Sequence, residues 1–209
     1  MSAGKLAAVL GLVGLATVLY FRSSSRESHA IFEPDVRPVE AATPCPWREA
    51  ETDTTNWFPG ATKYSIRDLV LSGKRLQLQE RLGRPLLPEE MALHCYPVLS
   101  NDLQIGTVLT RRLKGEHGAI EIALALDMDE RIRHFKIQRI REPSETLEAL
   151  GRCHLEAELK NKSFADRIVF NCPSLPESAK RLAEMLAGEV QALLILYEVG
   201  YSDVRPSHH

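Results

Sequence analysis

Large and small side chains alternate along residues 118–126, GAIEIALAL, more regularly than anywhere else in the chain. The bulky positions and the positions between them are, in order, Ile120, Ile122, Leu124, Leu126 and Ala119, Glu121, Ala123, Ala125. A period of two predicts a β-strand with one bulky face and one face of small side chains. The small face leaves room for a packed helix or for a flat ligand.

Further strands are predicted on both sides of this segment. QIGTVLTRR (104–112) is rich in residues that favour strands, and RIRHFKIQRI (131–140) follows the acidic turn DMDE (127–130). We therefore expect an antiparallel meander of at least three strands. YSIRDLVL (64–71) is compatible with a strand or a short helix, and ADRIVF (165–170) predicts a short strand.

The last part of the chain predicts a long amphipathic helix, because apolar residues recur at three- and four-residue spacing after Ser174. Ser174 and Glu177 form an S-x-x-E pattern, which predicts a capping box at the helix start. Strands followed by a helix that packs over them indicate an α+β domain. On these residues alone, SLPESAKRL (174–182) is expected to start a helix whose first turn is capped by its own side chains, with a structural role.

The N-terminal segment predicts a membrane anchor over residues 1–22. Residues 6–21 carry no charge and lie between Lys5 and Arg22. As a helix they would rise about 24 Å, slightly less than a hydrocarbon core of about 30 Å. A cleaved secretory signal is the alternative, but no small-x-small cleavage site follows the apolar run. Positive charges on the two sides nearly balance, so they do not set the orientation.

Residues 23–56 predict an extended linker, because four prolines fall between positions 34 and 46 and no apolar period persists. Within it, Cys45 and Trp47 could dock on the folded domain or on another subunit. The folded domain is expected over residues 57–200, with a tail at 201–209.

Composition narrows the class of protein only slightly. The 209 residues are 44% hydrophobic and 26% charged, as in ordinary globular proteins. A formal net charge of −2 gives no indication of nucleic-acid binding. We find no nucleotide-binding glycine pattern and no nucleophile motif, so no catalytic residue is predicted and an activity of its own is not expected.

The cysteines and histidines predict no metal site. Cys45, Cys95, Cys153 and Cys172 form no C-x-x-C pair but would allow two disulfides. Their pairing stays open, with Cys153 as a candidate partner of Cys172. His94, His117, His134 and His154 form no H-x-x-x-H pattern.

Three segments, taken in order, resemble the FMN-binding domain of the membrane-associated Rnf and Nqr electron-transfer complexes. They are FPGATKY (58–64), the central segment at 106–145, and RIVFNCPSLPESAKRLAEML (167–186). The resemblance implies an α+β domain, usually extracytoplasmic, that serves electron transfer beside a quinone- or ferredoxin-linked complex.

The resemblance also implies that covalent flavin has been lost. In that family the flavin phosphate is esterified to a threonine in an S-G-A-T-x-[ST]-[ST] segment, whose place is taken here by residues 172–178. The threonine falls on Leu175, which has no hydroxyl, and the glycine falls on Pro173, which has no N–H. Gly115 and Gly118 are retained in the strand entrance, and Glu142 in the loop REPSE.

Two main hypotheses follow from this comparison. The first is a membrane-anchored, flavin-free accessory subunit of a membrane electron-transfer complex, with its domain outside the cytoplasm and other subunits as partners. The second is an electron carrier that binds FMN without a covalent bond; its expected cofactor-binding residues are Gly115, Gly118, Glu142, Ser174 and Ser178. A third is a disulfide-stabilised extracytoplasmic domain without a redox partner.

Overall fold

The structure is a computed structural model that describes residues 45–170, 172 and 174–202. The anchor expected at residues 6–21, the linker before Cys45 and most of the tail lie outside the described residues. Within the part that is described, no helix is both long enough and apolar enough to cross a membrane.

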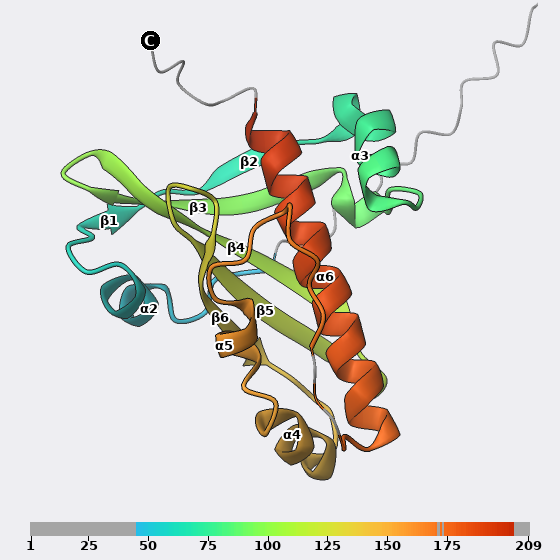
Figure 1. The fold of residues 1–209 in the computed structure, drawn as a ribbon. Helices are drawn as coiled ribbons and strands as arrows, with labels where there is room; N and C mark the ends of the chain where they lie inside the picture. The colour runs from blue at the N-terminus through green and yellow to red at the C-terminus, as the bar shows by residue number, and fades with distance from the viewer. Residues whose placement is uncertain (1–44, 171, 173, 203–209) are drawn as a thin grey trace, which may run out of the picture. The chain divides into compact units, whose positions relative to one another are not determined.

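A six-stranded antiparallel sheet forms the centre of the domain (Figure 1). Its strands run in the order β1-β3-β4-β5-β6, and β2 also pairs with β3. The predicted meander is confirmed as β4, β5 and β6. The strands are β1 (Lys63–Tyr64), β2 (Arg67–Val70), β3 (Ala92–Ser100), β4 (Leu103–Lys114), β5 (Ala119–Leu126) and β6 (Ile132–Arg139).

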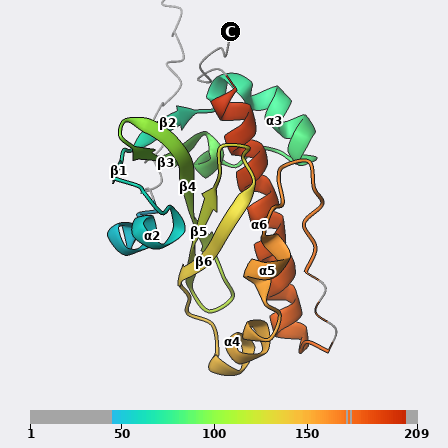
Figure 2. The ribbon, with the colours of Figure 1, turned by 60° about the vertical axis from the view of Figure 1, so that its left-hand side comes forward.

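Helices cover both faces of this sheet, so the expected α+β class with a long C-terminal helix is confirmed. The helix α6 and the shorter α3, α4 and α5 lie on one side, and α2 lies on the other (Figure 2). The helices are α2 (Ala50–Trp57), α3 (Arg75–Leu82), α4 (Ser144–Gly151), α5 (Leu155–Leu159) and α6 (Glu177–Tyr201), with short 3-10 turns η1 (Ser72–Lys74) and η2 (Pro88–Glu90).

The main core lies between α6 and the bulky face of the sheet. Ile122 and Leu124 of β5 are fully buried there, in one apolar cluster with Leu186 and Leu193 of α6. Burying a side chain of this size contributes roughly 1.5–3 kcal/mol. The bulky face predicted for β5 is therefore the face that holds α6.

The small face of β5 is covered by residues 45–58, which we call the N-terminal strap. Trp47, Trp57 and Phe58 form a second apolar cluster with Ala123 and Ala125, and both alanines are fully buried. Residues 45–56, expected to belong to a linker, are thus part of the folded domain. AETDTTNW has no apolar period, so the sequence of α2 does not reveal that it packs on the sheet.

Polar contacts fix the strap to the sheet as well. The Asp53 carboxylate accepts a hydrogen bond from Trp47 Nε1 at 3.0 Å and another from Lys136 Nζ of β6 at 2.8 Å. Thr110 Oγ1 of β4 donates to the Cys45 carbonyl at 2.6 Å. Trp47 and Cys45 therefore dock on the domain itself, one of the two expected destinations.

A buried ion pair joins η2 to the sheet. Glu90 is fully buried, where Arg84 contacts its carboxylate at 2.7 Å and Arg111 of β4 at 3.0 Å. Burial alone would raise the pKa of Glu90, but the two guanidinium groups and the Leu87 N–H hold it below its usual value. The short 3-10 turn η2 is thus fixed by charge pairing.

Two local predictions were wrong, and one ambiguity is resolved. Residues 165–170 form no strand, and the missed strand β3 lies in the middle of the chain. Residues 64–71 contribute the strands β1 and β2. The helix α6 begins at Glu177 with Pro176 as its N-cap residue and no side-chain cap, because Ser174 turns the chain with a φ of 77°.

Removing the Trp47 ring should destabilise the whole domain. Because Trp47 is only 6% exposed, Trp47→Ala should lower the free energy of unfolding by about 3–5 kcal/mol. Trp47→Phe keeps a ring but loses the bond to Asp53, so a loss of about 1–2 kcal/mol is expected. Urea unfolding followed by circular dichroism measures both. Glu51→Ala, an exposed change on α2, is the control, and an equal effect of Trp47→Ala would contradict the strap's role.

Candidate functional site

Three of the residues predicted to bind a cofactor meet at one end of the sheet. The turn between β4 and β5 closes with a hydrogen bond from the Gly115 N–H to the Gly118 carbonyl at 2.8 Å. Glu142, which follows β6, reaches this turn and accepts a bond from the His117 N–H at 3.2 Å. A side chain at position 115 would come within 2.9 Å of the Gly118 carbonyl and would also displace the Glu142 carboxylate, so the turn favours glycine there.

The Glu142 carboxylate is hydrogen-bonded to this turn and is nearly buried. Its side chain is 5% exposed, and its second oxygen lies 2.7 Å from His117 Nδ1. Burial alone would raise the pKa of Glu142, but the hydrogen bonds from His117 hold it below its usual value. Glu142 is therefore an anion whose hydrogen-bonding capacity serves the turn that it closes.

The first turns of α6 pack against the same end of the domain. Ser178 Oγ lies 3.2 Å from Thr146 Oγ1 of α4, and Arg181 contacts Glu116 of the β4–β5 turn at 3.0 Å. Ser178, also predicted to bind a cofactor, thus lies at this end of the domain. Ser174 does not cap α6, and it is exposed two residues before the N-cap residue.

We name the residues that meet here the end cluster: Gly115, Glu116, His117, Gly118, Glu142, Thr146, Ser178 and Arg181. Its polar side chains are hydrogen-bonded or ion-paired with one another. Leu175, which takes the place of the flavin threonine in the resemblance to FMN-binding domains, packs against the main apolar core. The sequence could not identify His117, Thr146 or Arg181 as members, because their contacts depend on how the helices are placed.

The face expected to accept either a helix or a flat ligand holds a helix. Trp47 and Trp57 stack there with ring centroids 6.0 Å apart and planes 18° from parallel. Gly106 of β4 lets Phe58 lie against the sheet, since a side chain at this glycine would come within 2.6 Å of the Leu126 carbonyl and collide with the Phe58 ring. The strap therefore occupies the space above the alanines.

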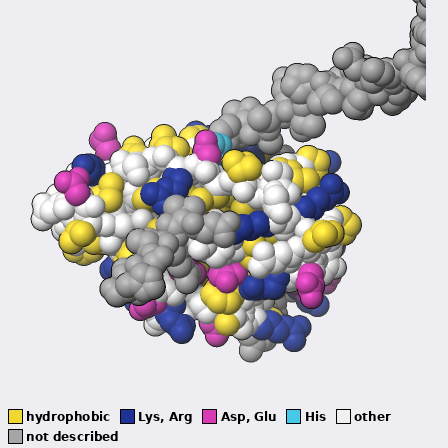
Figure 3. All heavy atoms as spheres, turned by 90° about the horizontal axis from the view of Figure 1, so that it is seen from above, with side chains coloured by type: hydrophobic (Ala, Val, Ile, Leu, Met, Phe, Trp, Pro, Cys, Tyr) yellow, Lys and Arg dark blue, Asp and Glu magenta, His cyan; other side chains and the backbone are white. Residues whose placement is uncertain are grey.

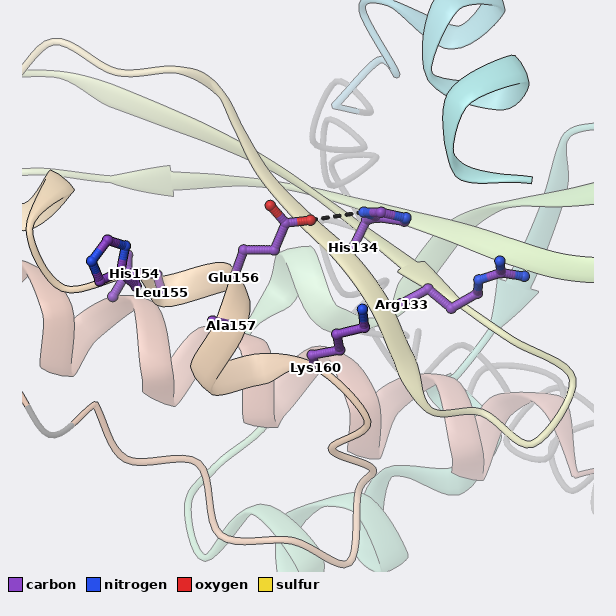
Figure 4. A pocket seen from close by; sticks show the side chains of 7 residues that line it. All are labelled: Arg133, His134, His154, Leu155, Glu156, Ala157 and Lys160. Carbon is purple, nitrogen blue, oxygen red and sulfur yellow. Dashed lines mark hydrogen bonds and ion pairs between the residues drawn. The ribbon is translucent and has the colours of Figure 1, made fainter. Parts of the chain in front are cut away.

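A separate open pocket of about 440 Å³ lies between β6 and α5 (Figure 4). His134 Nδ1 lies 2.7 Å from Glu156 Oε1 across it, and the ring of His134 stacks on Trp57. Sequence motifs gave no indication of this pairing, which joins residues 22 positions apart. Among the described residues no group of three or more His, Cys, Asp or Glu could hold a metal ion. The lining residues are Arg133, His134, His154, Leu155, Glu156, Ala157 and Lys160.

The cysteines divide into one bridge and two buried thiols. Cys153 and Cys172, the candidate pair, form a disulfide with Cα atoms 5.5 Å apart. It ties the end of α4 to the segment that precedes α6. Burial raises the pKa of the Cys45 thiol to about 11 and that of the Cys95 thiol to about 12, so neither is a reactive thiolate.

No protein-family model and no curated protein sequence matched this chain. The resemblance to FMN-binding domains consequently rests on the three segments quoted above. The end cluster is where two of them, the central segment and the C-terminal segment, come together in space.

Replacing Glu142 should weaken the end cluster in a pH-dependent way. A carboxylate with a lowered pKa stabilises the fold above its usual pKa of about 4.5, and this contribution is lost as the pH falls through its value in the folded protein. Glu142→Gln should therefore cost about 1–2 kcal/mol at pH 7, and the difference from wild type should shrink below pH 4.5. Urea unfolding across this pH range measures it. Glu145→Gln is the exposed control, and a difference that did not vary with pH would contradict this role.

Alkylation should distinguish the bridge from the buried thiols. The folded protein should take up no label, the denatured protein should take up two labels, and the reduced and denatured protein four, as counted by mass spectrometry. Replacing both bridge residues by serine should cost roughly 3 kcal/mol, since the bridge closes a loop of ordinary length. Four labels without reductant would contradict the bridge.

Proposed function

We propose that this protein is an accessory subunit of a membrane electron-transfer complex, anchored through residues 6–21, whose FMN-binding-like domain carries no flavin. The observation that carries this proposal is the end cluster. Its polar groups are hydrogen-bonded or ion-paired with one another, and Leu175 packs against the core at the position where FMN-binding domains attach their flavin. Such a domain would act by binding other subunits, with no catalytic step of its own.

The Cys153–Cys172 disulfide supports a location outside the cytoplasm. Disulfides persist in oxidising compartments and are rare where thiols are kept reduced. With an N-terminal anchor, the domain would then lie on the extracytoplasmic side of the cell membrane, beside the complex that it joins.

One observation favours the second function, an electron carrier with non-covalent FMN. Gly115, Gly118 and Glu142 lie together, as a site for an isoalloxazine ring would require. Binding there would have to release Glu142 from His117, because its carboxylate is already hydrogen-bonded to this turn. We therefore rank this function below the first.

An absorbance spectrum of the protein purified from its native membrane separates the two functions. The accessory subunit should be colourless by itself and co-purify with a larger coloured complex. Flavin absorbance that moves to the supernatant on acid precipitation would instead indicate non-covalent FMN. Flavin that stays in the pellet would contradict the interpretation of Leu175.

Two controls sharpen this experiment. If non-covalent flavin is found, Glu142→Gln should reduce its content while Glu145→Gln should not, because only Glu142 reaches the glycine turn. A colourless protein that is recovered alone would overturn both functions and favour a disulfide-stabilised domain without a redox partner.

A further inference from the structure

The sheet face that the strap covers, which we call the strap face, also carries a group of cations around one buried carboxylate. Glu121 of β5 is 1% exposed, and Arg112 of β4 contacts it at 3.0 Å. Arg48 of the strap pairs with its second oxygen. On the other side of Glu121, Arg139 of β6 is its partner in the strand register, as Arg112 is on β4. Two guanidinium groups thus pair with a single negative charge, and a third arginine lies beside it in the sheet.

Two further cations extend this group toward the β4–β5 turn. Lys114 lies two residues beyond Arg112 on β4, so it shares the same face of the sheet. The stem of Arg141 lies over Gly118 at the end of the same hairpin. We call the five residues the cationic face. They are Arg48, Arg112, Lys114, Arg139 and Arg141, and all of them are exposed.

The cationic face has a clear excess of positive charge. Among the described residues, Glu121 is the only carboxylate that its members pair with, because Glu116 and Glu142 of the adjoining turn pair with Arg181 and His117 instead. Farther along the same sheet face, Lys136 is neutralised, because it pairs with both Glu49 and Asp53. A protein with a net charge of −2 therefore concentrates positive charge at one place.

In its described residues, the end of the domain that carries β2 and α3 has a surface of mixed character. Ile66, Val70 and Leu76 are exposed there. Seen from above the view of Figure 1, however, hydrophobic, basic and acidic side chains are intermixed (Figure 3). No single kind of partner is indicated by such a mixture.

We propose that the cationic face docks on the anionic surface of a lipid bilayer. Exposed arginines and lysines bind lipid phosphates, and each adds to the attraction of a negatively charged membrane. The place where the described chain begins supports this partner. The Cys45 carbonyl accepts a hydrogen bond from Thr110, which lies two residues before Arg112 on the same face of β4, so the described chain enters the domain beside the cationic face. An anchor at residues 6–21 would tether the domain from this side, which leaves the cationic face free to reach the bilayer.

This docking proposal depends on the proposed function in one respect, the membrane anchor at residues 6–21. A membrane-spanning anchor retains the domain at the bilayer but leaves its orientation open, and a basic patch close to the surface adds electrostatic attraction. The cationic face would set the orientation of the domain on the bilayer while the anchor retains it. The loss of electrostatic docking in high salt distinguishes this contribution from insertion of an apolar segment.

Labelling of Lys114 tests the docked orientation. The full chain is reconstituted into nanodiscs of phosphatidylcholine, with or without phosphatidylglycerol, and treated with a water-soluble amine reagent. Docking should reduce labelling of Lys114 at least about fivefold in the anionic discs, and high salt should restore it. Lys160, exposed beside α5 on the other side of the sheet edge, should label equally in both discs.

A matched pair of variants assigns the effect to this face. Arg139→Gln with Arg141→Gln should return Lys114 labelling in anionic discs toward the neutral value. Arg75→Gln with Arg167→Gln removes the same charge from exposed sites elsewhere and should leave the protection intact. Circular dichroism checks that both variants fold.

The outcomes separate this proposal from the proposed function. Equal Lys114 labelling in both discs would overturn the bilayer as partner and favour an acidic protein surface. Failure of the chain to co-elute with either disc would contradict the anchor instead. In that event, vesicles of the same two compositions are added to the free chain, and lipid-dependent protection of Lys114 still decides whether the face docks.

Discussion

The packing of Trp47 on the alanine face of β5 is the interaction on which the rest of the domain depends. A single sheet with α6 on one face must still cover the apolar part of its other face, and the strap is the segment that does so. Asp53 makes this packing specific, because its buried carboxylate is shared between the indole N–H and Lys136. Without the indole, the alanines would face water and Asp53 would keep only one of these partners.

Side-chain periodicity predicted the elements whose two faces have different environments. β5 alternates because α6 and the strap lie on opposite sides of it, and α6 is amphipathic because one side of it is buried. The strap could not be predicted in this way. Its helix α2 owes its place to a few long-range contacts, such as those of Trp57, and residues without a repeating pattern give no local indication of them. The start of α6 was misplaced for a related reason: S-x-x-E satisfies the capping pattern locally, but the left-handed turn at Ser174 lies outside the helix.

The candidate site was partly predictable. Gly115, Gly118 and Glu142 were expected together from the resemblance, and they lie together. Ser178 lies at the same end of the domain, whereas Ser174 is exposed before the start of α6. What the sequence could not supply is how the polar groups are used. Glu142 would be available to a ligand if His117 were elsewhere, and the position of His117 follows from the β4–β5 register and not from a motif. Function in this cluster is therefore decided by tertiary pairing, since the residue types alone are compatible with either a cofactor site or a closed structural corner.

Glu121 connects the strap to the cationic face, so folding and surface charge are not independent in this domain. When the strap packs Trp47 on the sheet, it also places Arg48 against Glu121, where Arg112 of β4 pairs with the other carboxylate oxygen. A buried carboxylate without enough partners is costly, so the arginines that pair with Glu121 also stabilise the fold. Glu121 is almost completely buried, whereas the arginines that pair with it remain in contact with solvent. The carboxylate thereby positions the guanidinium groups on the surface, and the cationic face exists in this form only while the strap is docked.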